Sequence, residues 1–263
     1  MTISDLQYVA KIATGQSAKF YKFISKTKGH VILKETLKTE KGFIRSDIEA
    51  HYLQKCRETG LVPEFVYSFE TANRSYILTK AVSGTTLEDM SVHSYYSEAM
   101  GRDHIRSVIT GLTMLIQQGV LLRKLEPSQI LARDTNPYFD VMFLNLKSAI
   151  SYHPGAYNDI FETEKHPWDR QFDAEFGLPY LVGNLLYKLV VGSVPFRTEK
   201  DKEKVDIFWP REYKRYSDEM KGFIYSCLNK RQHRLKFSDL LNHEFFKTSL
   251  HSEQKSFLEA HHE

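Results

Sequence analysis

The feature that most constrains the fold is a change of hydrophobic period along the chain. The first third holds short runs of β-branched and aromatic residues, broken at Gly15 and at Lys28-Gly29, and such runs predict strands. From about residue 94 onward the apolar residues recur mainly at helical spacing. The expected strands cover residues 8–12, 19–25, 30–35, 65–69 and 75–79. The chain is therefore predicted to be α+β, with a small strand-rich part before a larger helical part.

Local signals mark the helices. Ser46 is followed three residues later by Glu49, which has the form of a capping box and predicts a helix beginning there. Residues 104–118 place apolar side chains on one face and are followed by Gly119, as at a helix C-terminus. Residues 178–191 are almost wholly apolar, which is typical of a buried helix. Further helices are expected at 216–228 and 237–246.

Composition excludes several classes of protein. The net charge of +3 lacks the clustered excess of a nucleic-acid binder, and the eleven histidines form no metal-ligand motif. No apolar run approaches the roughly 18 residues of a membrane span, and residues 1–5 do not resemble a signal peptide. Cys56 and Cys227 lie far apart and favour two buried thiols in a reducing compartment. We expect a cytoplasmic protein that binds no nucleic acid, no membrane and no metal.

A resemblance to protein kinases appears in the second half of the chain. Residues 120–131 resemble the kinase catalytic loop, H-R-D-L-x-x-x-N. Residues 183–196 resemble the buried central helix of a kinase domain, and residues 207–246 resemble its final helices. The catalytic-loop residues that are kept are Arg123, Leu125, Pro127, Ile130 and Leu131. The whole chain from about Tyr8 to Phe246 is similar to the protein-kinase family.

This resemblance implies a two-lobed protein-kinase-like fold in a single domain, residues 1–263. It divides the chain into an N-lobe, a hinge, a C-lobe and a polar tail, at residues 1–79, 80–84, 85–246 and 247–263. Residues 83–87 are also similar to calcium/calmodulin-dependent and giant muscle kinases.

The resemblance also implies a degenerate nucleotide pocket in the first lobe. Lys34 stands at the lysine of the third-strand V-A-I-K, and Glu49 stands at its ion-pair partner. Thr79 falls at the back of the pocket, Ala81 falls in the hinge, and Gly15 is the glycine that remains in the Gly-rich loop. The pair of Lys34 and Glu49 can clamp a nucleotide phosphate or serve as a structural salt bridge, and the sequence favours the structural pair.

Three substitutions change the positions that carry kinase chemistry. Lys124 replaces the catalytic-loop aspartate, and an ammonium cannot take the place of a carboxylate that receives a proton. Gln129 replaces the loop asparagine, and Asn145 replaces the metal-binding aspartate of D-F-G, so both magnesium sites are weakened. We expect Gln129 and Asn145 to bond nearby backbone, although Lys124 and Lys147 could instead neutralise phosphates directly. The sequence therefore predicts no catalytic residues, no bound magnesium, and weak or absent ATP binding.

An apolar column is preserved where the chemistry is lost. Leu53, Leu122 and Leu146 occupy positions where kinases stack apolar side chains through both lobes. The predicted function is therefore that of a pseudokinase, not an enzyme, which acts as a scaffold or allosteric regulator of a protein partner such as an active kinase or a regulatory protein. The alternatives are a kinase-fold enzyme with altered phosphate-transfer chemistry and a nucleotide-binding switch without transfer.

Overall fold

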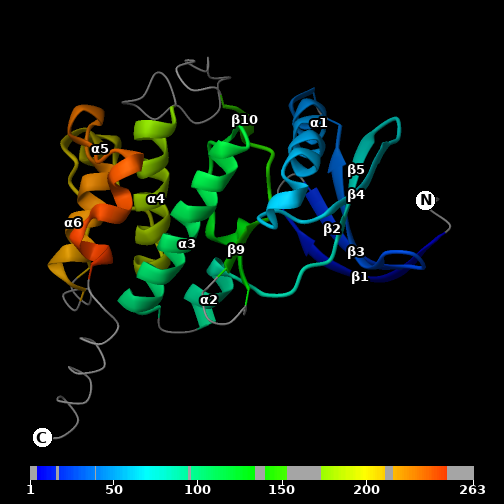
Figure 1. The fold of residues 1–263 in the computed structure, drawn as a ribbon, viewed down its shortest axis with the longest axis horizontal. Coiled ribbons are helices and arrows are strands. Elements are labelled where there is room, and N and C mark those ends of the chain that lie inside the picture. The colour runs from blue at the N-terminus through cyan, green and yellow to red at the C-terminus, as the bar shows by residue number, and fades with distance from the viewer. Residues whose placement is uncertain are drawn as a thin grey trace, which may run out of the picture.

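The computed structural model describes residues 5–15, 18–38, 40–93, 96–133, 140–152, 173–210 and 216–247. Figure 1 shows two parts side by side, a strand-rich N-terminal part with one long helix and a helical C-terminal part. The predicted mixed α+β, two-lobed architecture is therefore confirmed.

The N-terminal part is built on a five-stranded antiparallel sheet with the strand order β1-β2-β3-β5-β4. Its strands are β1 (Leu6–Thr14), β2 (Ala18–Ser25), β3 (Gly29–Leu37), β4 (Phe65–Glu70) and β5 (Arg74–Lys80). All five were predicted, because alternating β-branched and aromatic residues fix both the element type and the face that each side chain takes. Gly29 opens β3 with φ +69°, a conformation that glycine adopts without strain.

One long helix, α1 (Glu40–Lys55), packs against β3, β4 and β5. The helix begins at Glu40, so the predicted start at Ser46 is wrong. Ser46 lies within the helix and is buried, and its hydroxyl oxygen accepts a hydrogen bond of 2.9 Å from Ser75 of β5. The polar residue that resembled a cap serves instead to join the helix to the sheet.

The helical part is centred on α4, which is buried on nearly all sides and packs against α3 and α6. Its helices are α2 (Leu87–His93), α3 (Glu98–Gln117), α4 (Ala174–Val191), α5 (Glu199–Lys204) and α6 (Asp218–Leu228). The apolar run predicted this buried central helix correctly. Gly119 follows α3 with φ +69°, as the sequence signal for a helix end indicated.

The expected helix at 237–246 is replaced by two short 3₁₀ helices, η6 (Phe237–Asn242) and η7 (Glu244–Phe246). His243 separates them in an extended conformation, with φ −65° and ψ 146°, so one continuous ladder of helical hydrogen bonds cannot form. The Nδ1 atom of His243 accepts a hydrogen bond of 3.2 Å from the backbone N–H of Phe245.

Short strands and turns connect the sheet to the helices. They are η2 (Arg57–Thr59), β6 (Thr85–Thr86), β7 (Val120–Leu122), η3 (Pro127–Gln129), β8 (Ile130–Arg133), β9 (Asp140–Phe143), β10 (Ala149–Ser151) and η5 (Arg231–His233). β6, β8 and β9 form one small sheet, and β7 pairs with β10 in another. These pairings position the two loops that resemble catalytic and metal-binding segments, one after β7 and the other after β9.

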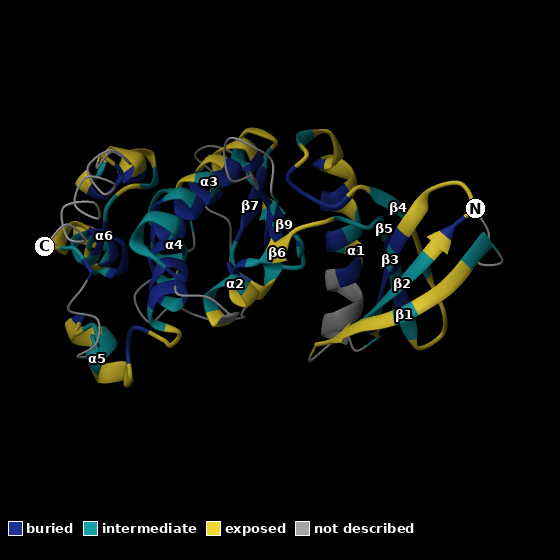
Figure 2. Cartoon of the chain, turned by 90° about the horizontal axis from the view of Figure 1, so that it is seen from below, coloured by how far each residue is buried: buried dark blue, intermediate teal, exposed yellow. Residues whose placement is uncertain are grey.

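The hydrophobic core runs from α1 into the helical part, and Figure 2 shows buried residues along this path. Polar contacts cross the same junction. The backbone N–H of Phe143 donates to the carbonyl of Leu61 at 2.8 Å, and the hydroxyl oxygens of Tyr52 and Ser151 lie 3.0 Å apart. The two parts are therefore joined by packing and by hydrogen bonds. Within the described residues, none of the helices combines the length and the apolar character needed to cross a membrane.

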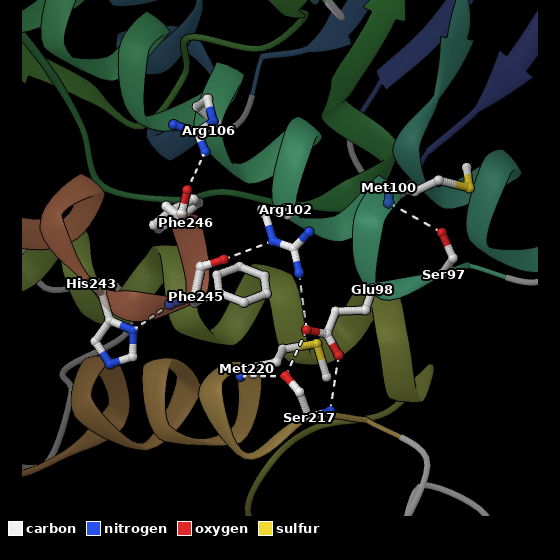
Figure 3. A network of polar contacts seen from close by, with 10 residues as sticks. All are labelled: Ser97, Glu98, Met100, Arg102, Arg106, Ser217, Met220, His243, Phe245 and Phe246. Carbon is white, nitrogen blue, oxygen red and sulfur yellow. Dashed lines mark hydrogen bonds and ion pairs between the residues drawn. The ribbon is translucent and has the colours of Figure 1, made fainter. Parts of the chain in front are cut away.

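A buried arginine ties the last described segment to α3 (Figure 3). Nε of Arg102 donates to the carbonyl of Phe245 at 2.7 Å, and one of its terminal nitrogens lies 3.2 Å from a carboxylate oxygen of Glu98. The same carboxylate accepts hydrogen bonds from the backbone N–H and the hydroxyl of Ser217, which caps α6. One network therefore joins α3, α6 and η7.

Candidate functional site

The predicted pair of Lys34 and Glu49 is formed. Lys34 lies on β3 and Glu49 on α1, and the Nζ atom of Lys34 is 2.6 and 2.8 Å from the two carboxylate oxygens. The residues are 8% and 1% exposed. The ring of Phe20, on the neighbouring strand, has its centroid 5.6 Å from the same ammonium. Each buried charge is thus neutralised by its partner, as burial of ionised groups requires.

The other predicted pocket residues lie on elements around this pair. Thr79 pairs with Ile32 in the register of β3 and β5, which places it on the same face of the sheet as Lys34. The backbone N–H of Ala81 donates to the carbonyl of His30 at 2.9 Å, so this donor is already used within the chain. Gly15 lies at the turn between β1 and β2, where its N–H donates to the carbonyl of Ala18 at 2.8 Å.

The loop after β7 carries a charged group that sequence reasoning missed. Glu126 lies two residues after Lys124, and its carboxylate oxygens are 3.5 Å from Nζ of Lys124 and 2.9 Å from Nζ of Lys188. Lys188 belongs to α4. The loop sequence could have revealed this site. Lys124 stands where the kinase motif has an aspartate, and Glu126 places a carboxylate two residues later.

The loop after β9 holds Asn145, which stands at the metal-binding aspartate of the kinase D-F-G motif. The side-chain oxygen of Asn145 accepts a hydrogen bond of 2.9 Å from the backbone N–H of Lys147, which is the local backbone contact that the sequence favoured. The backbone carbonyl of Gln129 accepts a hydrogen bond of 2.8 Å from the backbone N–H of Leu144 in this loop. Among the described residues, no cluster of three histidine, cysteine, aspartate or glutamate side chains could hold a metal ion. Asn145 and Gln129 themselves carry neutral amides in place of the anionic oxygens that magnesium prefers.

The predicted apolar column lies in the core between these loops. Leu53, Leu122 and Leu146 are 3%, 2% and 0% exposed and belong to the same hydrophobic cluster. Nε of Arg123, next to Leu122, donates to the carbonyl of Ser148 at 3.2 Å and so links the two loops. The loops are thus held in place by buried apolar side chains and by a direct polar contact.

The two cysteines are free and buried, as predicted. Burial raises the pKa of the Cys56 thiol to about 11 and raises the pKa of Cys227 further. Neither sulfur is therefore a thiolate near neutral pH, and neither has the electropositive, accessible setting of a reactive cysteine.

Comparisons with known proteins place this geometry in context. No protein-family model matches the chain. Calcium/calmodulin-dependent protein kinase type I of Schizosaccharomyces pombe is 24% identical over 231 residues, which cover 82% of this chain and 69% of that protein. The chain is therefore similar in sequence to protein kinases. G protein-coupled receptor kinase 2 of Drosophila melanogaster is 25% identical over 247 residues, 81% of this chain and 33% of that kinase. Calcium/calmodulin-dependent protein kinase cmkB of Emericella nidulans is 27% identical over 187 residues, 61% of this chain and 44% of that kinase.

These kinase relatives correct one expectation from the sequence. The substitutions at Lys124, Gln129 and Asn145 led us to predict that the chain is not an enzyme. That prediction is wrong by this comparison, because all three relatives are named as protein kinases. Two of the three are named as calcium/calmodulin-dependent kinases, a subgroup to which the sequence had been likened.

Proposed function

We propose that the chain is a kinase-fold phosphotransferase with altered chemistry, which binds ATP weakly and uses lysines in place of magnesium. The observation that carries this proposal is the buried pair of Lys34 and Glu49. Burying two charges is costly, and apolar residues of similar size would often give an equally stable fold. A buried ammonium beside a region that resembles a nucleotide pocket is therefore better explained by phosphate binding than by stability alone.

The proposed chemistry follows from the cations on the two loops. Lys124 and Lys147 follow β7 and β9, close to the positions where kinases hold metal. A lysine can neutralise phosphate as a point charge, although it lacks the geometry with which a dication bridges two phosphates. Transfer would therefore be slow, and would not require the metal.

Binding of ATP can be tested by its effect on thermal unfolding, since a ligand that binds only the folded state raises Tm. ATP is added in EDTA and in magnesium to the parent protein and to the double variant Lys34→Met/Glu49→Gln. The double change avoids an unpaired buried carboxylate, which would itself destabilise the fold by about 3–5 kcal/mol. Lys38→Ala is the matched control. Lys38 follows directly after β3, the strand that carries Lys34, and it forms an exposed ion pair with Glu70.

The proposal predicts a rise in Tm with ATP in EDTA that is similar to the rise in magnesium. The rise should vanish in the double variant and persist in Lys38→Ala. No rise in either condition, or a rise that needs magnesium, would contradict the proposal.

A second candidate function is protein binding by the face of the sheet that lies opposite α1. Val31, Leu33 and Leu78 form a separate hydrophobic cluster there. Aromatic rings surround it, and Tyr8 and Tyr67 at its margins are 57% and 49% exposed. Exposed aromatic side chains around an apolar cluster are typical of protein interfaces. This face supports the predicted protein partner, an active kinase or another regulatory protein.

The partner hypothesis is tested with the double variant Tyr8→Lys/Tyr67→Lys. Tyr225→Lys on α6 is the control, because Tyr225 is also 49% exposed. A protein that binds the parent and Tyr225→Lys, but not the double variant, should be isolated and should bind again when both proteins are pure. Equal binding to all three forms would exclude this face.

A further inference from the structure

The catalytic-loop segment has a carboxylate displaced by two residues. Lys124 occupies the position where a kinase places the aspartate that receives the acceptor proton, and a protonated lysine cannot receive one. Glu126 brings a carboxylate to the same loop, 3.5 Å from the ammonium of Lys124. The loop therefore keeps one carboxylate, two residues after the position of the kinase aspartate.

The surroundings of Glu126 hold its carboxylate in a defined place. Lys188 reaches it from the buried helix α4, with 2.9 Å between Nζ and a carboxylate oxygen. The neighbours on either side, Leu125 and Pro127, are buried and anchor the backbone. Side chains that are fixed by a rigid element and by buried neighbours make precise catalytic groups.

Glu126 also remains accessible to a substrate. Its side chain is 28% exposed, and the side chains of Lys124 and Lys188 are 39% and 22% exposed. A carboxylate that is oriented by two cations and still reaches solvent can contact an incoming hydroxyl group. The side chains of Lys34 and Glu49 are less exposed, at 9% and 2%.

We propose that Glu126 is the catalytic carboxylate of this chain, orienting the acceptor hydroxyl and receiving its proton during phosphate transfer from ATP. This inference rests on the phosphotransferase function proposed above. The acceptor oxygen forms a bond to the γ-phosphorus, and the bond from that phosphorus to the β,γ-bridging oxygen breaks. ADP leaves with the electron pair of that bond. The acceptor proton passes to Glu126 and then to water, so atoms and charge balance.

The lysines beside Glu126 have separate roles in this arrangement. Lys188 fixes the position of the carboxylate from α4. Lys124, the more exposed of the two, is placed beside the carboxylate that receives the hydroxyl, where an ammonium stabilises negative charge on the transferring phosphate. An acceptor hydroxyl on a peptide or protein would therefore find a base and a cation within one loop.

The test is the rate of phosphate transfer from γ-labelled ATP to the protein itself and to a mixed protein acceptor. Glu126→Gln keeps the size of the side chain and removes its ability to take a proton. We expect its transfer rate to fall by about 10²–10⁴-fold, the usual effect of losing a general base. The rise in Tm with ATP should be unchanged, since the ATP-binding pair is intact. Glu70→Gln is the control, because Glu70 lies on β4 and forms an exposed ion pair with Lys38.

The exchange variant Lys124→Asp/Glu126→Lys separates a chemical role from a structural one. This variant places the carboxylate at position 124, two residues earlier, and it should transfer phosphate faster than Glu126→Gln. If Glu126→Gln transfers as fast as the parent, Glu126 is not the base, whereas the phosphotransferase proposal stands. If the parent binds ATP without any transfer, the phosphotransferase proposal and this inference both fail.

Discussion

His104 illustrates how one residue can make stability depend on pH. It is fully buried on α3, and its Nδ1 atom lies 2.7 Å from the hydroxyl oxygen of Tyr96. Burial lowers the pKa of His104 from its usual 6.5 to about 4, because the charged imidazolium loses its hydration. The ring is therefore neutral in the folded protein at neutral pH.

We predict that the protein loses stability as the pH falls from about 6.5 to about 4. In this range the unfolded chain binds a proton at His104 and the folded chain does not, so the free energy of unfolding decreases. The contribution of this residue amounts to about 3 kcal/mol at the lower limit. Chemical denaturation of the parent and of His104→Gln, at several pH values, measures it. The variant should show a flatter profile, and an unchanged slope would contradict the assignment.

Some residues of the candidate site could be predicted from the sequence, and others could not. The substitutions at Lys124, Gln129 and Asn145 could be recognised because each lies in a short motif. The setting of Glu126 could not, because Lys188 lies 62 residues away and is brought to it only by the folding of α4. The backbone partner of Ala81 likewise depends on the adjacent strand and leaves no local signal.

At the scale of elements, α4 and α6 pack at close range around one glycine. A Cβ atom added at Gly183 would lie 2.5 Å from the Cβ of Cys227, and neither helix backbone can yield easily. We predict that Gly183→Ala lowers the free energy of unfolding by about 1–3 kcal/mol through overpacking.

A matched glycine in α6 provides the control. The nearest atom to a Cβ at Gly222 would be 4.0 Å away, on His243. Gly222→Ala should therefore raise stability by about 0.5–1 kcal/mol, because alanine favours the helix. Urea denaturation of both variants gives the comparison, and equal effects would contradict the packing argument.

Element types were easier to predict than element ends. The five strands followed from their alternating side chains, and α4 followed from its apolar run. The start of α1 was missed because Ser46 matches a cap locally but bonds to Ser75 on another element. The prediction of a single helix at 237–246 was wrong because the apolar spacing there is equally compatible with two 3₁₀ turns separated by an extended His243.

At the scale of the whole molecule, the network around Arg102 joins segments from distant parts of the chain. Arg102 is 4% exposed, bonds the carbonyl of Phe245, and pairs with Glu98, which in turn holds Ser217. Arg106 makes a similar contact to the carbonyl of Phe246, at 2.8 Å, but it is exposed.

We predict that Arg102→Ala lowers the free energy of unfolding by about 3 kcal/mol, because it leaves a half-buried carboxylate and a carbonyl without their partner. Arg106→Ala should lower the free energy of unfolding by about 1 kcal/mol or less, because the guanidinium is exposed to water in both the folded and the unfolded protein. Thermal and urea unfolding of both variants check this order. Equal losses would mean that the ion pair with Glu98 contributes nothing.

The proposed function is a phosphate transfer that needs no metal. Transfer of label from γ-labelled ATP, measured in EDTA and in magnesium on one preparation, tests this most directly. We expect transfer in both conditions at rates of the same order, and loss of transfer in Lys34→Met/Glu49→Gln. Transfer only in magnesium, or none in either condition, would contradict it.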